Sequence, residues 1–180
     1  TTLLKLITGE KQPDSGIVQI GNNVKIGYYS QEQEMLHPEY QVIDEVRNMF
    51  NYGEGEARNI LGMFLFRGDD VFKQVGMLSG GEKARLSLLC LFLERPNFLI
   101  LDEPTRGIDV GAKYDIYCLI NKMVEDGKSV IMISSEMPEL LGMCDRIYVM
   151  SEGRLAGEFT AEEATQERIM ASIMQEQNKK

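Results

Sequence analysis

Short apolar runs separated by amphipathic stretches set the pattern of the second half of the chain. The run at 97–101 shows no alternation of apolar and polar side chains, which is typical of a central parallel strand covered on both faces. A second apolar run at 129–133 predicts another strand. Between these runs, apolar residues recur on one face at helical spacing: Ala112, Ile116, Leu119, Ile120 and Met123. Alternation of strand and helix predicts an α/β fold with a mostly parallel sheet flanked by helices.

The first half of the chain predicts short elements separated by turns. We expect the end of a helix over 2–8, two short strands over 17–20 and 24–29, and helical turns from about 42 to 73. A long helix should follow from Ser79 to Glu94 and end before Pro96.

The domain organisation follows from these elements. We expect one domain over residues 1–180, in which the helical stretch at about 34–77 forms a small subdomain beside the sheet. The last part of the chain predicts a short helix at 137–143 and a closing pair of strands at 147–150 and 155–159. Thr160 and Glu163 predict a capping box in front of a final helix.

Composition and charge exclude several classes of protein. The 180 residues are 43% hydrophobic and 26% charged, which is typical of a globular chain with one sizeable core. The 19 basic and 28 acidic side chains give a net charge of −9, so we expect no autonomous nucleic-acid binding. The longest apolar run, residues 88–93, is far shorter than the roughly 20 residues that a membrane span needs.

The cysteines and the single histidine carry no chemistry in this interpretation. Cys90, Cys118 and Cys144 are widely spaced, odd in number and set among apolar neighbours, which predicts buried free thiols in a reducing cytosol. His37 lies in a polar loop, and we expect it to be solvated.

Two acidic residues, Asp102 and Glu103, directly follow the apolar run at 97–101. That places them at the carboxyl end of a strand, where open α/β sheets bind ligands. There Asp102 is suited to hold Mg²⁺, and Glu103 to orient and polarise a water for attack on a terminal phosphate. A strand that ends in solvated acids is the alternative.

The segment Leu78–Ser79–Gly80–Gly81–Glu82 stands at the start of the predicted long helix. Ser79 is a good N-cap, and the two glycines let the backbone approach a ligand. The exposed N–H groups and the helix dipole then make an anion site. An ordinary capped helix start is the alternative. Because this motif and the acidic pair occur in this order, with one long helix between them, we favour the phosphate-binding interpretation.

With both motifs present, the chain resembles an ATP-binding cassette (ABC) ATPase over essentially its whole length. In that family residues 78–82 match the signature, and Asp102 and Glu103 match the magnesium ligand and the catalytic glutamate. Gln31 matches a glutamine that contacts the metal and the γ-phosphate, and Asp109 matches the D-loop aspartate. The resemblance implies a P-loop NTPase-like fold, ATP and Mg²⁺ as ligands, and a head-to-tail pair of cassettes. The signature of one cassette, including Ser79, Gly80 and Gly81, closes over the ATP of the other.

The chain departs from that family at two places. The phosphate loop reads G-x-x-x-x-G-K-[ST], and the chain begins at its last position. Thr1 therefore stands where the family binds Mg²⁺ and nucleotide, and Thr2 stands at the next nucleotide-binding position. We expect a fragment that lacks the rest of this loop and the preceding strands. Ser135 stands at the position of the family's switch histidine, and a serine cannot do the imidazole's job.

The resemblance changes near Thr105. Residues 1–105 resemble a cassette of the ABC-F class, which acts on ribosomes, in the stretches 25–33, 55–61 and 79–86. Residues 106–180 resemble the carboxy-terminal cassette of a monosaccharide importer of the ribose or galactose type, in which a serine at position 135 is usual.

Three functions follow as alternatives. The first is a cassette that binds and hydrolyses MgATP at a dimer interface to power transport, with sugar import indicated by the carboxy-terminal half. Its partners would be membrane permease subunits, and it would lie in the cytoplasm at the inner face of the plasma membrane. The second is a translation factor that binds the ribosome. The third is an inactive, truncated or chimeric remnant that at most folds and pairs with other cassettes.

Overall fold

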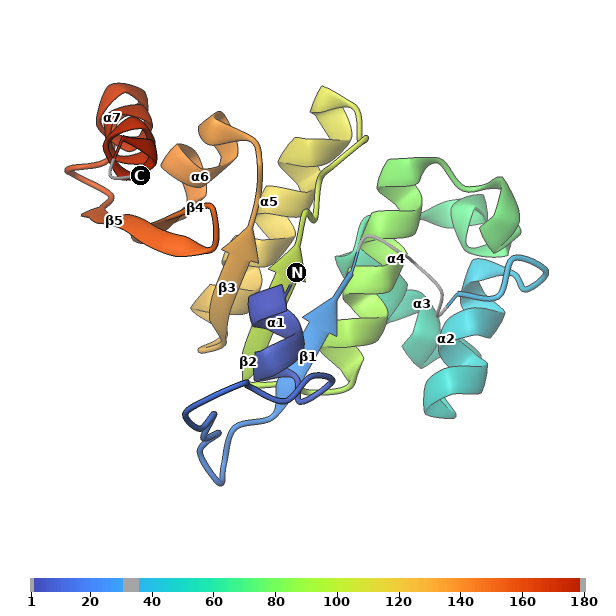
Figure 1. Ribbon diagram of the computed structural model, residues 1–180. Helices are drawn as coiled ribbons and strands as arrows, with labels where there is room; N and C mark the ends of the chain where they lie inside the picture. The colour runs from blue at the N-terminus through green and yellow to red at the C-terminus, as the bar shows by residue number, and fades with distance from the viewer. Residues whose placement is uncertain (1, 31–35, 179–180) are drawn as a thin grey trace. The chain divides into compact units, whose positions relative to one another are not determined.

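Three parallel strands form the sheet of the first part of the molecule (Figure 1). The computed structural model describes residues 2–30 and 36–178. Strands β1 (Ile26–Tyr29), β2 (Phe98–Asp102) and β3 (Ser129–Ile133) are neighbours in that order, and β2 is hydrogen-bonded on both sides. Its central residues Leu99, Ile100 and Leu101 are completely buried, which confirms the interpretation of the non-alternating run.

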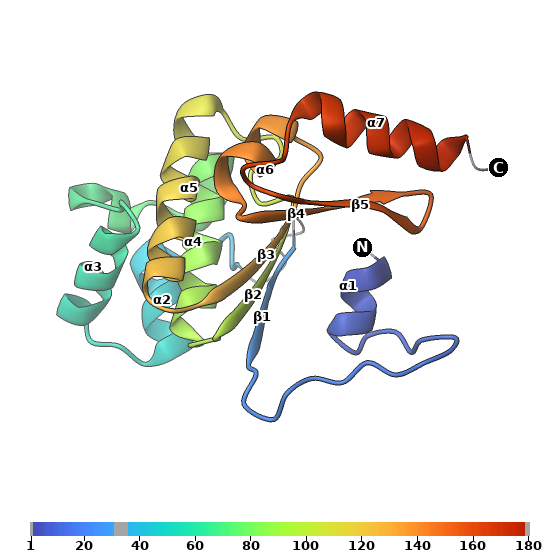
Figure 2. The same ribbon diagram turned by 90° about the vertical axis from the view of Figure 1, so that its left-hand side faces the viewer.

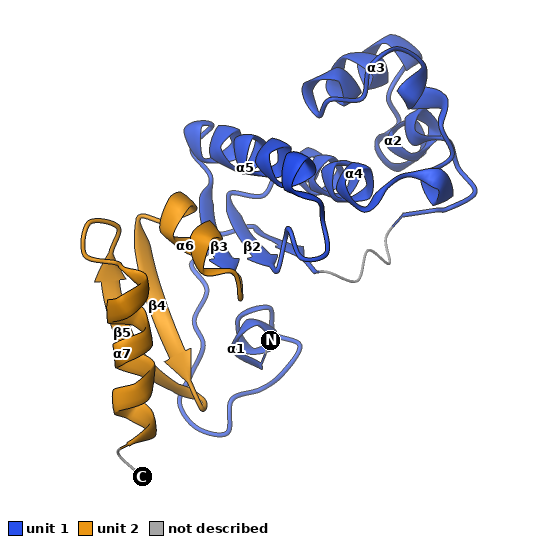
Figure 3. Cartoon of the chain, turned by 90° about the horizontal axis from the view of Figure 1, so that it is seen from above, with its two compact units in different colours: residues 1–133 blue, residues 134–180 orange. Residues whose placement is uncertain are grey.

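The chain divides into two compact units, residues 1–133 and 134–180 (Figure 3). The first unit contains the parallel sheet, and the second contains a separate two-stranded sheet. No helix within the described residues is long and apolar enough to cross a membrane.

Two helices of the first unit, α4 (Gly80–Leu93) and α5 (Val110–Glu125), lie on one face of its sheet (Figure 2). The long helix expected from Ser79 to Glu94 is confirmed, with these two residues as its caps. The apolar face predicted for α5 is also buried at Ile116, Leu119, Ile120 and Met123, whereas Ala112 is only partly buried.

The remaining helices of the first unit are short. They are α1 (Thr2–Ile7), α2 (Val42–Phe50) and α3 (Glu54–Met63), with 3₁₀ turns η1 (Gly68–Phe72) and η2 (Val75–Met77). Breaks near residues 53 and 68 separate them, as the glycines predict. All of them except α1 lie in the stretch of about 34–77 for which a helical subdomain is predicted.

The strand predicted at 17–20 does not form. These residues have neither helical nor strand structure, and Ile17 is 87% exposed. No strand in the described part of the chain lies beside them, and a β-rich segment needs a partner to satisfy its backbone groups. The next strand is also shorter than expected: it begins at Ile26, because the Val24 N–H closes a turn onto the Gly21 carbonyl at 3.0 Å.

His37 is exposed, as expected, but it is not a bystander. Its Nδ1 lies 3.1 Å from Oε1 of Glu45, whose side chain is fully buried in α2, and its ring stacks on Tyr40. A buried carboxylate requires a hydrogen-bonding partner, and His37 supplies one. The following residues are held by backbone bonds from Gly76 N–H to the Pro38 carbonyl and from Val75 N–H to the Tyr40 carbonyl, each 2.9 Å long.

The second unit packs two helices, α6 (Met137–Met143) and α7 (Gln166–Gln177), with the hairpin of β4 (Arg146–Ser151) and β5 (Arg154–Thr160). The two-residue turn at Glu152 and Gly153 has positive φ at both positions, as tight hairpin turns require. The hairpin and the short helix are confirmed predictions. The capping box is wrong: Thr160 Oγ1 does donate to Glu163, but α7 begins at Gln166 and is capped by Thr165.

The cysteines differ in exposure. Cys90 is buried in α4, and this burial raises its pKa to about 12. Burial also raises the pKa of the half-buried Cys144. Cys118 is exposed, so the prediction of three buried thiols is wrong for this residue. Cys118 lies two residues after the buried Ile116 in α5. Because a helix turns by more than half a circle over two residues, Cys118 lies on the side of α5 away from Ile116.

We predict that a thiol reagent at neutral pH modifies Cys118 in the native protein and leaves Cys90 intact, because Cys118 is exposed, whereas Cys90 is buried and its burial disfavours the thiolate. Peptide mapping after timed labelling measures the two rates. Cys118→Ser is the control and should abolish the fast phase. Labelling of Cys90 at the same rate as Cys118 without denaturant would contradict the fold.

Candidate functional site

The two acidic residues lie where the sequence predicts, at the carboxyl end of β2. Asp102 is the last residue of that strand and is paired in register with Ile133 of β3. The Glu103 N–H donates to the Ile133 carbonyl at 2.8 Å, which fixes the turn directly after the strand. Both side chains are half-buried. The edge of the sheet therefore presents two adjacent carboxyl groups, while their chemical roles remain predictions.

Tyr28 contacts this acidic pair. Its hydroxyl donates to Oδ2 of Asp102 at 3.3 Å from the neighbouring strand β1. Tyr28 is paired with Ile100, so Tyr28, Ile100 and Asp102 share one face of the sheet. Tyr28 is not apparent as a site residue from the sequence alone. The signal was present in the two-residue period of the strands, but strand register is needed to use it.

Glu103 has a strained backbone. Its φ of 52° lies in the left-handed region, which costs a residue with a side chain about 1 kcal/mol. The hydrogen bond from Glu103 to β3 and a bond from the Arg106 N–H to the Glu103 carbonyl (3.2 Å) hold the residue there. Such outliers gather at functional sites because the surrounding structure must impose them.

The signature-like segment forms a fully capped helix start. The Glu82 N–H donates to Ser79 Oγ at 3.2 Å, and the Ser79 N–H donates to Glu82 Oε2 at 2.8 Å. Burial alone raises the pKa of Glu82, but the Ser79 N–H and the Lys73 ammonium outweigh it and hold the pKa below its ordinary value. Lys73 Nζ lies 3.1 Å from Glu82 Oε1 and 2.8 Å from Asp70 Oδ1, a pair of contacts that no motif in the sequence indicates.

The two glycines of this segment have different surroundings. A Cβ added at Gly80 meets nothing within 4 Å, and this residue is exposed. A Cβ added at Gly81 would lie 2.4 Å from the Cβ of Ala112 in α5. The open backbone that a ligand needs is therefore found at Gly80, whereas Gly81 faces a neighbouring helix.

Asp109 is the N-cap of α5. Its Oδ1 accepts a hydrogen bond from the Ala112 N–H at 3.0 Å, and the residue is exposed. Since Gly81 contacts Ala112, the first turns of α4 and α5 lie side by side, and the Ser79 and Asp109 caps stand at the same end of the helix pair.

The other predicted site residues lie outside the described residues or in other elements. Thr1 and Gln31 lie outside the described residues. Thr2 is the exposed first residue of the six-residue helix α1. Ser135 is exposed and belongs to the second unit. The roles of these four residues remain predictions.

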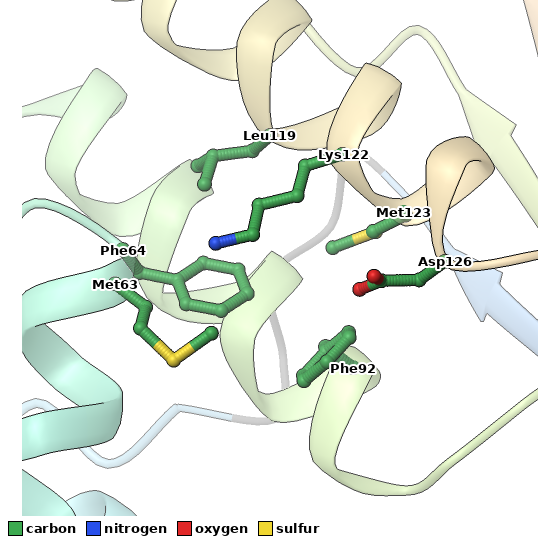
Figure 4. Close-up of a pocket in the computed structure, with 7 residues that line it drawn as sticks. All are labelled: Met63, Phe64, Phe92, Leu119, Lys122, Met123 and Asp126. Atoms are coloured by element: carbon green, nitrogen blue, oxygen red, sulfur yellow. The ribbon is translucent and has the colours of Figure 1, made fainter.

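One small pocket lies at the opposite ends of the same helices (Figure 4). It is lined by residues from α3, α4 and α5, among them Phe64, Phe92 and Asp126. Its volume is about 10 Å³, which is room for about one water molecule. Phe92 and Asp126 follow Ser79 and Asp109 by nearly the full length of each helix. This pocket is therefore distinct from the candidate site and too small for a nucleotide.

A parallel sheet with acidic residues at the carboxyl end of its central strand and helices on one face defines the class of open α/β domains, which bind ligands at that end of the sheet. The family model described as ABC transporter matches residues 1–106, which is more than half of the chain. The chain therefore belongs to the ABC transporter family. The predicted fold is confirmed by the solved dimeric, post-hydrolysis structure of the ATP-binding cassette MJ0796 bound to ADP and Pi. It is similar with a TM-score of 0.72 and 22% identity over 89% of this chain and 79% of that chain.

Two curated relatives are sugar-transport proteins. The L-arabinose transport ATP-binding protein AraG of Geobacillus stearothermophilus is 54% identical over 115 residues, or 64% of this chain and 22% of that protein. The xylose import ATP-binding protein XylG of Moorella thermoacetica is 59% identical over 98 residues, or 54% of this chain and 19% of that protein. The chain thus spans about a fifth of the length of these relatives.

The similarity to sugar-transport proteins crosses the predicted change of resemblance near Thr105. Residues 106–180 number 75, so at least 40 of the 115 residues aligned with the arabinose protein lie before residue 106. Neither relative is named for action on ribosomes, and the predicted ribosomal partner gains no support from them.

We predict that the free energy of unfolding of Glu103→Gly exceeds that of Glu103→Ala by about 0.5–1 kcal/mol, because glycine adopts a positive φ without the steric penalty of a Cβ. Urea denaturation of both variants measures the difference. Lys122, at an exposed position inside α5, provides the control: there the alanine variant should be more stable by about 1 kcal/mol. An alanine variant that equals or exceeds the glycine variant at position 103 would show that the strain is absent.

Proposed function

We propose that this chain is part of a cassette that binds and hydrolyses MgATP at the interface between two cassettes. The proposal rests chiefly on the acidic pair at the carboxyl end of β2, in the same unit as the capped signature segment at the start of α4. Family membership supports nucleotide binding, whereas the metal, the hydrolysis and the pairing of cassettes are part of the proposal.

Asp102 fits a magnesium site. Mg²⁺ takes oxygen ligands and is held in proteins by one or two carboxylates together with phosphate oxygens and water. Within the described residues no three His, Cys, Asp or Glu side chains converge, so Asp102 suits such a shared site better than an all-protein cage. The Tyr28 hydroxyl bonds Oδ2 and so orients the carboxylate, leaving Oδ1 for the ion. When bound, Mg²⁺ would neutralise charge on the phosphates. By family resemblance, Thr1 and Gln31 would add ligands.

Glu103 is proposed to orient and polarise the attacking water. A carboxylate one residue beyond the metal ligand stands next to the phosphates that Mg²⁺ binds, and phosphoryl transfer depends mostly on positioning and electrostatics. Thr2 is assigned to nucleotide contact in the same cassette. Ser135, at the position of the switch histidine, would act as a hydrogen-bonding group at the γ-phosphate.

The signature segment is proposed to bind the ATP held by a second cassette. The first N–H groups of a helix have no acceptor within the helix, and the capping box uses those of Ser79 and Glu82. The N–H group of the exposed Gly80 then suits an anion at the positive end of α4, and Gly81, which is buried against α5, is assigned to the same anion by family resemblance alone. Asp109 stands beside them on α5 and would contact the partner cassette at the same interface.

The transported substrate is proposed to be a sugar. Two relatives named for arabinose and xylose transport support this, and they suggest membrane permease subunits as partners. A cassette with such partners would work from the cytoplasm at the inner face of the plasma membrane.

The test is ATP turnover by the chain preceded by a G-x-x-x-x-G-K loop in frame with Thr1. We predict Mg²⁺-dependent turnover that falls about 10²-fold or more in Glu103→Gln, because the amide cannot accept a proton from water. Glu125→Gln, on the exposed end of α5, is the control and should retain activity. Turnover that survives Glu103→Gln would refute the assigned role. No turnover in any form would favour an inactive remnant.

A second prediction concerns Tyr28→Phe, which removes only the hydroxyl that bonds Asp102. The Mg²⁺ concentration for half-maximal turnover should rise about 3- to 10-fold, while the rate at saturating Mg²⁺ changes little. The expected rise is at the low end for residues that support a metal ligand, because the Tyr28–Asp102 hydrogen bond is long. A Mg²⁺ titration at fixed ATP measures both quantities. Tyr52→Phe is the control variant and should leave the titration unchanged. An altered maximal rate with an unaltered midpoint would contradict the orienting role.

A further inference from the structure

The first turns of α4 and α5 are in unusually close contact. The Cα of Gly81 approaches the Cβ of Ala112 so nearly that a Cβ on residue 81 would lie 2.4 Å from it. Cβ atoms attached to two backbones cannot rotate out of such a contact, so any side chain at position 81 would push the helices apart. Ile108 lies 3.5 Å from the same point and leaves no room on that side.

A second contact follows one turn further along both helices. Arg85 Nη1 lies 3.1 Å from Asp115 Oδ2, and the arginine side chain is only 12% exposed. The guanidinium also lies 5.7 Å from the centre of the Phe66 ring. Its Nε is buried and has no hydrogen-bond partner among the described residues. The Asp115 carboxylate is in direct contact with the guanidinium, and Asp70 also interacts with Arg85 through its charge.

These two contacts show that α4 and α5 run in the same direction. Position 81 meets position 112 and position 85 meets position 115, so both chains advance together, and both positive helix ends lie at one place. Like ends repel each other. Each end carries its own carboxylate, Glu82 in the capping box of α4 and Asp109 at the N-cap of α5, which offsets this repulsion.

We propose that Gly81 and Arg85 are positioning residues that hold the Ser79–Gly80 segment and Asp109 at a fixed spacing, so that the two caps form one rigid edge. Gly81 sets the distance between the helices, and Arg85 fixes their register. Ser79 is two residues before Gly81, and Asp109 is three residues before Ala112, so neither cap can move independently of the contact. The contact of this edge with a second cassette rests on the proposed function, whereas the packing of α4 against α5 is independent of it.

The test compares Gly81→Ala with Gly80→Ala, a matched control in the same motif. Gly81→Ala should lower the Tm by about 3–8 °C, because the helices must separate. Gly80→Ala should leave the Tm unchanged or raise it, since its surroundings are open. Adding Ala112→Gly to Gly81→Ala should return the Tm to within about 2 °C of the parent, although Ala112→Gly alone lowers it.

Amide exchange separates positioning from general stability. In Gly81→Ala the Ala112 N–H, which donates to the N-cap Asp109 of its own helix α5, should lose at least 10-fold of its protection under native conditions, while amides of β2 keep theirs. In the double variant the protection of the N–H at position 112 should return. Additive Tm losses, or protection that fails to return, would overturn the proposal.

Asp115→Asn supplies an independent variant if Gly81→Ala does not fold. It keeps the shape of a half-exposed side chain and removes the charge facing Arg85. The Ala112 amide should again lose protection, and no loss would overturn the role of Arg85. The Tm and amide-exchange measurements contain no nucleotide, so they test the packing even if the chain has no ATPase activity. Turnover by the loop-bearing chain should fall in Gly81→Ala and recover in the double variant if the edge serves the proposed function.

Discussion

The burial of β2 is the constraint on which the rest of the first unit depends. Its three central side chains are completely excluded from water, and both of its edges are hydrogen-bonded to parallel neighbours. Because the strand cannot shift by one residue without reversing its side chains, its register fixes where the buried run ends. Asp102 and Glu103 therefore stand at the edge of the sheet. The strained turn at Glu103 then follows directly from that ending, held by a bond to β3.

The elements that the sequence predicts correctly are those set by a local signal. A non-alternating run identifies β2, an N-cap serine followed by two glycines identifies the start of α4, and glycines near residues 53 and 68 mark breaks between the short helices. The elements that fail depend on distant parts of the chain. The β-rich residues 17–20 lack a partner strand in the described structure, and β propensity alone does not hold an isolated strand together. At the other end, Thr160 and Thr165 offer competing caps, and only packing selects between them.

The candidate site shows the same division. Its acidic residues and its signature segment follow from motif and position, and the structure confirms where they lie. Tyr28 requires strand register, and the difference between Gly80 and Gly81 requires knowledge of which side α5 packs against. His37 is exposed, but its bond to the buried Glu45 cannot be predicted from its own surroundings, because Glu45 lies in the next helix. Polar residues that bind across elements are the class that pattern reading misses.

The central claim is that the carboxyl end of β2 receives the metal and phosphates of MgATP. Paramagnetic broadening tests it most directly, because Mn²⁺ in place of Mg²⁺ broadens NMR signals close to the bound ion even when binding is weak. With Mn²⁺ and ATP, the account predicts selective broadening at Tyr28, Asp102 and Glu103, with Phe92 and Asp126 at the far ends of the helices unaffected, and loss of the effect in Asp102→Asn. Broadening centred elsewhere, or unchanged in Asp102→Asn, would contradict it.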